Sequence, residues 1–163
     1  PLQRKHGFEL AGYFMVETGL LNQVVHYWKW DSAAHRQECR QSLYNDAEWG
    51  EYRKTNASVI VEQYNRLLAG TDVVEPFAFM GNGSELAFVD ERTYTITYPQ
   101  VPAFIELTKK LAYPITGGAG WQLIGYFTSL PGTVNQVVHL WYWDSQAQLL
   151  MMARSGWSGL SAR

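Results

Sequence analysis

A stretch of 21 residues near the start of the chain recurs near its end with 13 identical positions. The first repeat segment runs from Gly12 to Ser32 and the second from Gly125 to Ser145, at a constant offset of 113 positions. Both contain Gly-Tyr-Phe, then Asn-Gln-Val-Val-His, then two tryptophans and Asp-Ser. Chance does not align so many Trp, His and Asn residues in register. The chain is therefore an internal duplication, and each half is predicted to repeat one supersecondary unit.

Each repeat segment predicts a β-hairpin followed by a helix. Residues 8–16 alternate loosely, residues 22–30 are an extended run rich in Val, Tyr and Trp, and Gly19 between them suits a tight turn. The second hairpin is expected over 121–143, with a Pro-Gly turn at 130–132. Each hairpin ends at Asp-Ser, a pair typical of helix N-caps, so a helix is expected to begin at Ser32.

The rest of the chain shows alternating helical and extended patterns. Apolar residues recur at three- and four-residue steps over two stretches, and threonines alternate with apolar residues over a third. We therefore predict a helix over 48–69 ended by Gly70, an edge strand over 72–80, a strand over 92–98, a helix over 101–112, a loop over 116–120 and a final helix over 145–154.

The order of these elements predicts an α+β fold of two tandem ferredoxin-like (βαββαβ) units. The first unit is expected over 1–83 and the second over 84–163. Each is clipped at one chain end. The first lacks its opening strand and most of its first helix, and the second lacks a clear closing strand.

Composition excludes several functional classes. A net charge of −2 gives no bulk electrostatic attraction to nucleic acid. The single cysteine, Cys39, excludes an internal disulfide and a multi-cysteine metal site. No apolar run is long enough for a transmembrane helix, and no secretory signal peptide is present. Because the chain begins at Pro1, we expect a processed or partial product whose targeting segment is missing.

The strongest candidate site is a set of His and Trp side chains on one face of each second strand. Two interpretations stay open. If two sheets pack face to face, these residues line an interior ligand pocket with aromatic walls. Alternatively, they form a packed core in which each His is held by hydrogen bonds. The set comprises His26, Trp28, Trp30, His139, Trp141 and Trp143.

The remaining polar candidates have structural interpretations. Four amides that follow the turns could read a ligand or, alternatively, fix loop backbone: Asn22, Gln23, Asn135 and Gln136. Asp31 and Asp144 are expected to cap helices. Cys39 has only His35, one turn back, as a possible base. No catalytic triad, phosphate loop or metal-ligand spacing is present, so no catalytic residue and no metal site are predicted.

The repeated string resembles the NIPSNAP family, and the text downstream of it agrees. Arg36 and Arg40 resemble the family's helix, and the segments 46–49, 61–68 and 91–94 resemble its acidic-x-Glu-Trp turn, terminal helix and opening strand. The resemblance implies tandem ferredoxin-like domains that form a pseudo-symmetric dimeric α/β barrel. It also implies mitochondrial adaptor or scaffold proteins, and it provides no catalytic residue set.

The expected function is a non-catalytic mitochondrial scaffold or accessory subunit that acts through protein–protein interaction and needs no cofactor. Expected partners are subunits of a mitochondrial complex or a second copy of the protein. Nucleic acid is not expected as a partner, and any membrane association would be peripheral and through partners. One alternative is a small-molecule-binding or cofactor-free monooxygenase-like barrel. Another is a haem-binding barrel with His26 or His139 as axial ligand.

Overall fold

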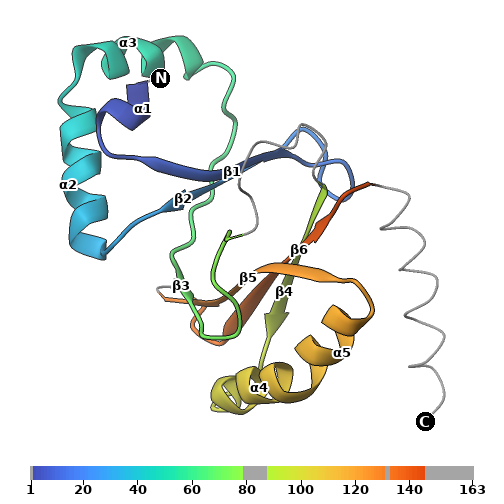
Figure 1. Cartoon of the computed structure of the whole chain (residues 1–163). Helices are drawn as coiled ribbons and strands as arrows, with labels where there is room; N and C mark the ends of the chain where they lie inside the picture. Colours follow the sequence, from blue (N-terminus) through green and yellow to red (C-terminus); the bar gives the residue numbers. More distant parts are fainter. Residues whose placement is uncertain (1, 79–87, 131–132, 146–163) are drawn as a thin grey trace. The chain divides into compact units, whose positions relative to one another are not determined.

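The computed structural model describes residues 2–78, 88–130 and 133–145. The chain divides into two compact units, Pro1–Tyr64 and Asn65–Arg163 (Figure 1), and each is described by itself. The predicted boundary between repeats, at 83/84, lies outside the described residues.

Unit 1 contains the first predicted hairpin and the helix after it. Strands β1 and β2 pair antiparallel, and Ser32 caps α2 by accepting a 3.0 Å hydrogen bond from the His35 amide. Both predictions are therefore confirmed. The elements of this unit are α1 (Leu2–Lys5), β1 (Glu9–Met15), β2 (Val24–Lys29), α2 (Ala33–Tyr44) and α3 (Ala47–Asn56).

The long helix predicted over 48–69 is wrong beyond its first part. Helix α3 ends at Asn56, and residues 60–67 form neither helix nor strand. The consecutive β-branched residues of 59–61 lose side-chain freedom in a helix and so weaken its continuation. Leu68–Gly70 then forms strand β3, whose backbone pairs with β5. Gly70 thus lies in a strand and does not end a helix.

Unit 2 is a four-stranded antiparallel sheet in the order β3-β5-β6-β4, with helices between β4 and β5 (Figure 1). The predicted α+β class is confirmed. The predicted helix over 101–112 and the second hairpin are also present. The elements after β3 are β4 (Phe88–Thr95), α4 (Val101–Leu107), the π-helical turn η1 (Thr108–Ala112), α5 (Tyr113–Gly118), β5 (Gln122–Ser129) and β6 (Gln136–Trp143).

Three predicted elements of unit 2 differ from the structure. The described part of the predicted strand over 72–80 consists of turns and bends. Strand β4 ends at Thr95, before the predicted 98, because the chain turns where the Gln100 amide bonds the Thr97 carbonyl at 2.7 Å. The predicted loop over 116–120 begins as helix α5, which runs to Gly118. The predicted final helix over 145–154 lies almost wholly outside the described residues.

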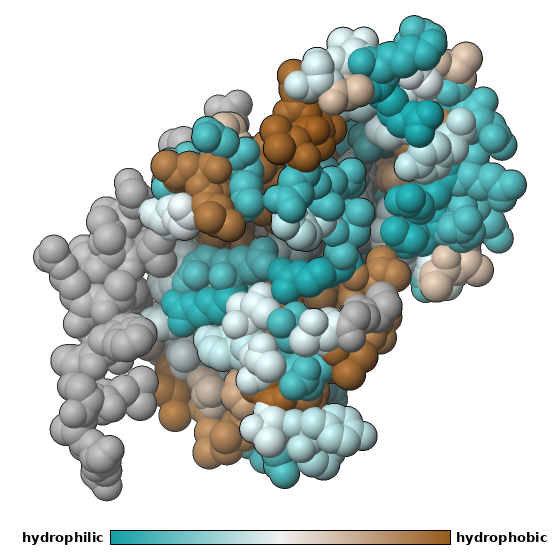
Figure 2. All heavy atoms as spheres, turned by 180° about the vertical axis from the view of Figure 1, so that it is seen from behind, coloured by the Kyte–Doolittle hydropathy of each residue, from teal (hydrophilic) through white to brown (hydrophobic). Residues whose placement is uncertain are grey.

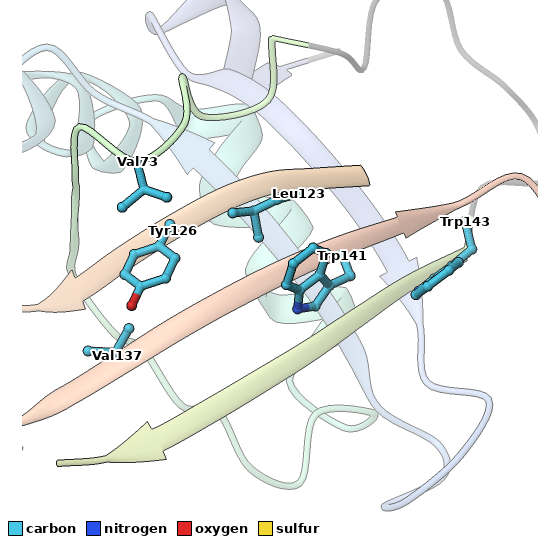
Figure 3. Close-up of a cluster of buried hydrophobic side chains, with 6 residues drawn as sticks. All are labelled: Val73, Leu123, Tyr126, Val137, Trp141 and Trp143. Atoms are coloured by element: carbon cyan, nitrogen blue, oxygen red, sulfur yellow. The ribbon is translucent and has the colours of Figure 1, made fainter. Parts of the chain in front are cut away.

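The core of unit 2 is aromatic and centres on β6, where every residue after Gln136 is buried. Figure 3 shows the cluster: Val73, Leu123, Tyr126, Val137, Trp141 and Trp143. Val101, Phe104 and Ile105 of α4 pack against it. Full burial of such side chains contributes roughly 1.5–3 kcal/mol each, so this cluster is a major source of stability for unit 2.

The core of unit 1 is smaller and lies between the hairpin and its helices. Its buried members are Phe8, Cys39 and Leu43. Leu2, Trp28, Trp30 and Trp49 pack against them while remaining partly exposed. Strand β2 has no fully buried residue, in contrast to β6.

Candidate functional site

The two hairpins share one pairing register. Tyr13 is opposite His26 in the first, and Tyr126 is opposite His139 in the second. Each hairpin also has a register shift at the residue before the glycine of Gly-Tyr-Phe. Such a β-bulge bends a strand and re-aims the side chains beside it. The sequence duplication is therefore a structural duplication. Equivalent residues of the two hairpins lie on equivalent faces of their sheets, because both hairpins have the bulge at the same position.

The structural repeat begins before the first identical residues. Gly7 and Gly120 both have positive φ, +80° and +84°, where a helix ends and the chain turns into the hairpin. The next residue is aromatic in both repeats, Phe8 and Trp121. Each aromatic ring packs edge-on against the two tryptophans of its own repeat segment, at 5.4 and 4.8 Å between ring centres in unit 1 and at 5.4 and 5.3 Å in unit 2.

His139 is enclosed by aromatic rings. Its side chain lies 4.2 Å from Tyr126, 4.7 Å from Tyr94 and 6.2 Å from Phe104, measured between ring centres. Burial, and to a lesser extent the positive charge of Arg92, lowers the pKa of His139 to about 4. The imidazole is thus neutral at physiological pH. In unit 2 the predicted His–Trp set is a packed core, and His139 Nε2 has no hydrogen-bond partner among the described residues.

His26 occupies a different environment at the equivalent position. It stacks on Tyr13 at 5.7 Å, and partial burial lowers its pKa. Its ring borders a cavity of about 440 Å³ in unit 1. The cavity is lined by Gln3, Arg4, Leu10, Tyr13, His26, Trp28 and Tyr52. Its walls are mostly aromatic, and its polar groups are a guanidinium, an amide, the His26 imidazole and two tyrosine hydroxyls, a composition that suits ligand or partner binding.

Equivalent residues on this face differ greatly in exposure. Tyr13 is 61% exposed and Tyr126 is fully buried; Val24 is 48% exposed and Val137 is fully buried. Leu10 is 37% exposed, whereas Leu123 is 6% exposed. Apolar side chains reach the surface at several places (Figure 2). The face of the first hairpin that includes Leu10, Tyr13, Val24 and His26, called here the open face, is therefore an exposed version of a core surface.

The other predicted site residues have structural surroundings. Trp30 packs on Phe8 and His35, and Trp143 lies 1% exposed in the unit 2 cluster. Each unit is described by itself, so the interior pocket shared by the two His–Trp sets stays a prediction. Trp28 is the one predicted tryptophan that lines the cavity.

Of the four turn amides, Asn135 bonds backbone through its side chain, whereas Asn22, Gln23 and Gln136 take part through their own backbone. Asn22 has φ +63°, a left-handed conformation that asparagine tolerates better than most residues, and the Gln23 carbonyl accepts from the Val16 amide at 3.1 Å. Asn135 Nδ2 donates to the Ile96 carbonyl at 2.8 Å, and Gln136 pairs with Thr95.

Sequence reasoning missed most of the cavity lining. Tyr13 was available as a signal, because Gly-Tyr-Phe is part of the repeat and Tyr13 is on the strand that pairs with His26. Tyr52 comes from α3, where it stacks on Trp49 at 4.9 Å. No sequence signal identifies Gln3 and Arg4, which lie on the short helix α1.

The described residues hold no constellation for metal binding. No group of three or more His, Cys, Asp or Glu side chains among them is placed to bind an ion. Cys39 is buried. The Nδ1 atom of His35 lies 3.2 Å from the Asp31 carboxylate. Ser32, rather than Asp31, provides the side-chain cap, while the helix that Asp144 was expected to cap is not described. No helix in the described ranges is long and apolar enough to span a membrane.

Fold and site define an α+β protein built on a repeated aromatic hairpin, with one hairpin buried and the other bordering a cavity. The chain belongs to the NIPSNAP family, whose model matches residues 1–74 and 89–154. It is 31% identical over 140 residues to human NipSnap homolog 3A and 30% identical to mouse NipSnap homolog 3B, covering 84% of this chain in each case. These stretches are 55% of each relative, so the chain spans about half the length of the curated relatives it matches. No solved structure gives a significant match.

Proposed function

We propose that this protein is a non-catalytic NIPSNAP-type scaffold or accessory subunit of mitochondria that acts through protein–protein contact. One observation carries the proposal: the open face exposes side chains whose equivalents in the second repeat form a core. Covering an exposed apolar side chain contributes roughly 1.5–3 kcal/mol, so this face gains stability when another polypeptide covers it. Exposed apolar patches of this kind mark interaction surfaces.

The edges of the same hairpin support a partner. In unit 2, β3 pairs with β5 and β4 pairs with β6, so both hairpin strands have an outer neighbour. Among the described residues, β1 and β2 form a two-stranded sheet with no third strand. Sheet edges are templates for pairing with another chain. The proposed complex therefore uses the first hairpin, and its partner is a subunit of a mitochondrial assembly or a second copy of the protein.

The same proposal includes the finer architecture. Two tandem ferredoxin-like units arranged as a pseudo-symmetric α/β barrel would give each hairpin a full set of strand and helix neighbours. The strand order β5-β6-β4 with α4 between β4 and β5 supports this for the second repeat. Any membrane association would be peripheral and through the partner.

Co-purification from mitochondria tests the scaffold proposal. The tagged chain is expected to fractionate with mitochondria and to elute within a complex larger than itself. Tyr13→Ser combined with Leu10→Ser should release the partner, because both changes remove apolar contact from the open face. Val59→Ser is the control, since Val59 lies outside the hairpin, is 68% exposed and does not line the cavity. The proposal would be contradicted if the chain behaved as a free monomer, or if the partner co-purified equally with the wild type and the open-face variant.

The cavity favours one further candidate function, the binding of a small molecule. The ligand would be either the substrate of a cofactor-free monooxygenase-like protein or haem. Tyr13, His26 and Trp28 provide aromatic walls, and His26 offers a ring nitrogen to a ligand. Haem addition should then give a Soret band that is lost in His26→Ala. Shifts of the His26 ring resonances in a screen of small aromatic acids would favour the other form. Absence of both responses would leave the scaffold as the function of this face.

A further inference from the structure

Two arginines from different helices meet over one tyrosine in unit 1, where α3 follows α2 along the chain (Figure 1). The guanidinium carbon of Arg40, on α2, lies 5.5 Å from the centre of the Tyr44 ring, and that of Arg53, on α3, lies 5.1 Å from it. A cation over an aromatic face is attracted by the negative charge of the ring face. Tyr44 is 49% exposed, so dissolved molecules can reach the ring on which the two positive charges converge.

Neither arginine forms an ion pair within the described part of the chain. Carboxylates are not scarce in unit 1, because Glu38 and Glu48 are exposed and also form no ion pair with a described residue. Every lysine of this unit, by contrast, has a carboxylate partner. These pairs are Lys5 with Asp46, Lys29 with Glu9 and Lys54 with Glu51.

A third arginine adds to the positive charge on α2. Arg36 lies four residues before Arg40, and residues at this spacing are neighbours on one side of a helix. Like charges at this spacing destabilise a helix, and Arg53 brings another like charge to the same tyrosine. A bound anion would offset this repulsion, since it interacts favourably with each guanidinium.

We propose that Arg40, Arg53 and Tyr44 form a binding site for a phosphate monoester of a water-soluble molecule. A phosphate monoester carries roughly 1.5–2 negative charges at pH 7 and three strong acceptor oxygens, which suits more than one cation. A guanidinium is a planar fork of N–H donors that bonds two phosphate oxygens at once, whereas a lysine ammonium is a point charge. Arg36 contributes further positive charge from the next turn of α2.

The charges favour a single localised anion over a membrane surface. Basic clusters that bind anionic membranes typically gather about 4–8 Lys or Arg side chains, and this cluster has three arginines. The exposed Glu38 on the same helix and the net charge of −2 both oppose attraction to an anionic surface. The site shares no residue with the open face, so it goes beyond the proposed scaffold function and can fail independently of it.

Titration with O-phosphoserine tests the site directly. We would add it to the full chain and follow the Tyr44 ring and the arginine Nε–H groups by NMR. Saturable shifts with a dissociation constant of about 1 mM are expected, a typical weak affinity for so small a ligand. Glutamate at the same ionic strength is the matched control ligand, because it has a carboxylate in place of the phosphate. It should cause no saturable shifts.

Protein variants locate the binding. Arg40→Gln and Arg53→Gln should each weaken phosphoserine binding about 10-fold, because each removes charge-assisted hydrogen bonds. Lys54→Gln removes the same charge from the next position of α3 and should change binding less than about twofold, since Lys54 is paired with Glu51. Arg40→Lys should recover only part of the affinity, because it restores the charge without the planar fork. Circular dichroism should show the same helix content in all variants.

Several results would overturn the inference. They are the absence of saturable shifts with phosphoserine, an equal response to glutamate, and a loss in Lys54→Gln as large as in Arg53→Gln. Vesicles that contain phosphatidic acid provide the last comparison. If they sediment with wild type but not with Arg40→Gln, and phosphoserine has no effect, the arginines would recognise a membrane surface instead of a soluble phosphate.

Discussion

Tyr13 and Tyr126 hold the same position in two matching hairpins, each opposite a histidine, yet one is 61% exposed and the other fully buried. The difference lies in what covers them. Tyr126 is under helix α4 and η1, with its hydroxyl bonded to Thr108. The two tyrosines can therefore be compared within one chain, because they share residue type and register and differ in exposure.

That comparison predicts unequal effects of removing the two hydroxyls. Tyr126→Phe should lower the free energy of unfolding by about 1 kcal/mol, the typical net contribution of a hydrogen bond. Thr108 keeps its 3.0 Å bond to the Phe104 carbonyl, which limits the loss. Tyr13→Phe should change stability by less than about 0.5 kcal/mol, because surface changes have small effects. Urea denaturation of both variants checks this, and equal losses would contradict it.

The glycines of Gly-Tyr-Phe provide a second matched pair. A Cβ on Gly125 would lie 2.4 Å from Cε2 of Phe127 and 3.2 Å from Cδ1 of Leu140. Both neighbours are buried, so Gly125→Ala should cost about 1–3 kcal/mol through overpacking. A Cβ on Gly12 would lie 2.6 Å from Cε2 of Phe14, a ring that is only partly buried.

Gly12→Ala should accordingly cost less than Gly125→Ala. Thermal unfolding followed by circular dichroism provides the measurement for both. If Gly12→Ala proves the more damaging change, the first hairpin is held more tightly than its exposure indicates.

Stability should rise with pH because of His139. Its pKa is lowered in the folded state from 6.5 to about 4, mainly by burial and secondarily by Arg92. The unfolded chain thus binds the proton more readily, and stability is complete above about pH 6.5 and is lost as the pH falls toward 4. The shift corresponds to roughly 3 kcal/mol.

His139→Gln removes this titration and should flatten the dependence of unfolding free energy on pH between 6.5 and 4. His26→Gln is the control and should flatten it less, because the pKa of His26 is lowered by partial burial only. The slopes, rather than the absolute stabilities, are the quantity to compare. Equal slopes in wild type and His139→Gln would show that His139 is not enclosed as described.

Asp46 should matter for both a helix start and a charge cluster. One carboxylate oxygen caps α3 by accepting from the Glu48 amide at 2.8 Å, and the other lies 2.8 Å from Lys5 Nζ and His6 Nε2. Hydrogen bonds from Lys5 and then His6 hold the pKa of Asp46 well below its usual range. Its contribution is therefore present above pH 3.8 and is lost at lower pH.

Asp46→Ala should reduce stability more than Asp46→Asn, because the amide oxygen of Asn keeps an acceptor for the helix cap. Both remove the charge and should also free Lys5. Helical circular dichroism with denaturant titration separates the two losses. Identical behaviour of the two variants would mean that the cap contributes little.

Local pattern was enough to predict both hairpins, the start of a helix at Ser32 and the helix over 101–112, although it assigned the cap to Asp31. It failed where distant contacts decide, as at Leu68–Gly70, whose strand exists because β5 pairs with it. The site shows the same limit more sharply. His26 and His139 are within identical five-residue strings, so no local signal distinguishes them. Their different surroundings come from elements outside the repeated strings: helix α4 packs over His139, whereas His26 borders a cavity lined in part by α1 and α3.

The shared register has a consequence for how this chain reaches its native state. Strand β2 carries nearly the same sequence as β6, so β5 can accept either as neighbour with Tyr126 still opposite a histidine. A pairing of β5 with β2 would be a kinetic trap during folding, because it must break before the native sheet can form. Duplication thus gives the protein two matched hairpins and, with them, a competing partner for each hairpin strand.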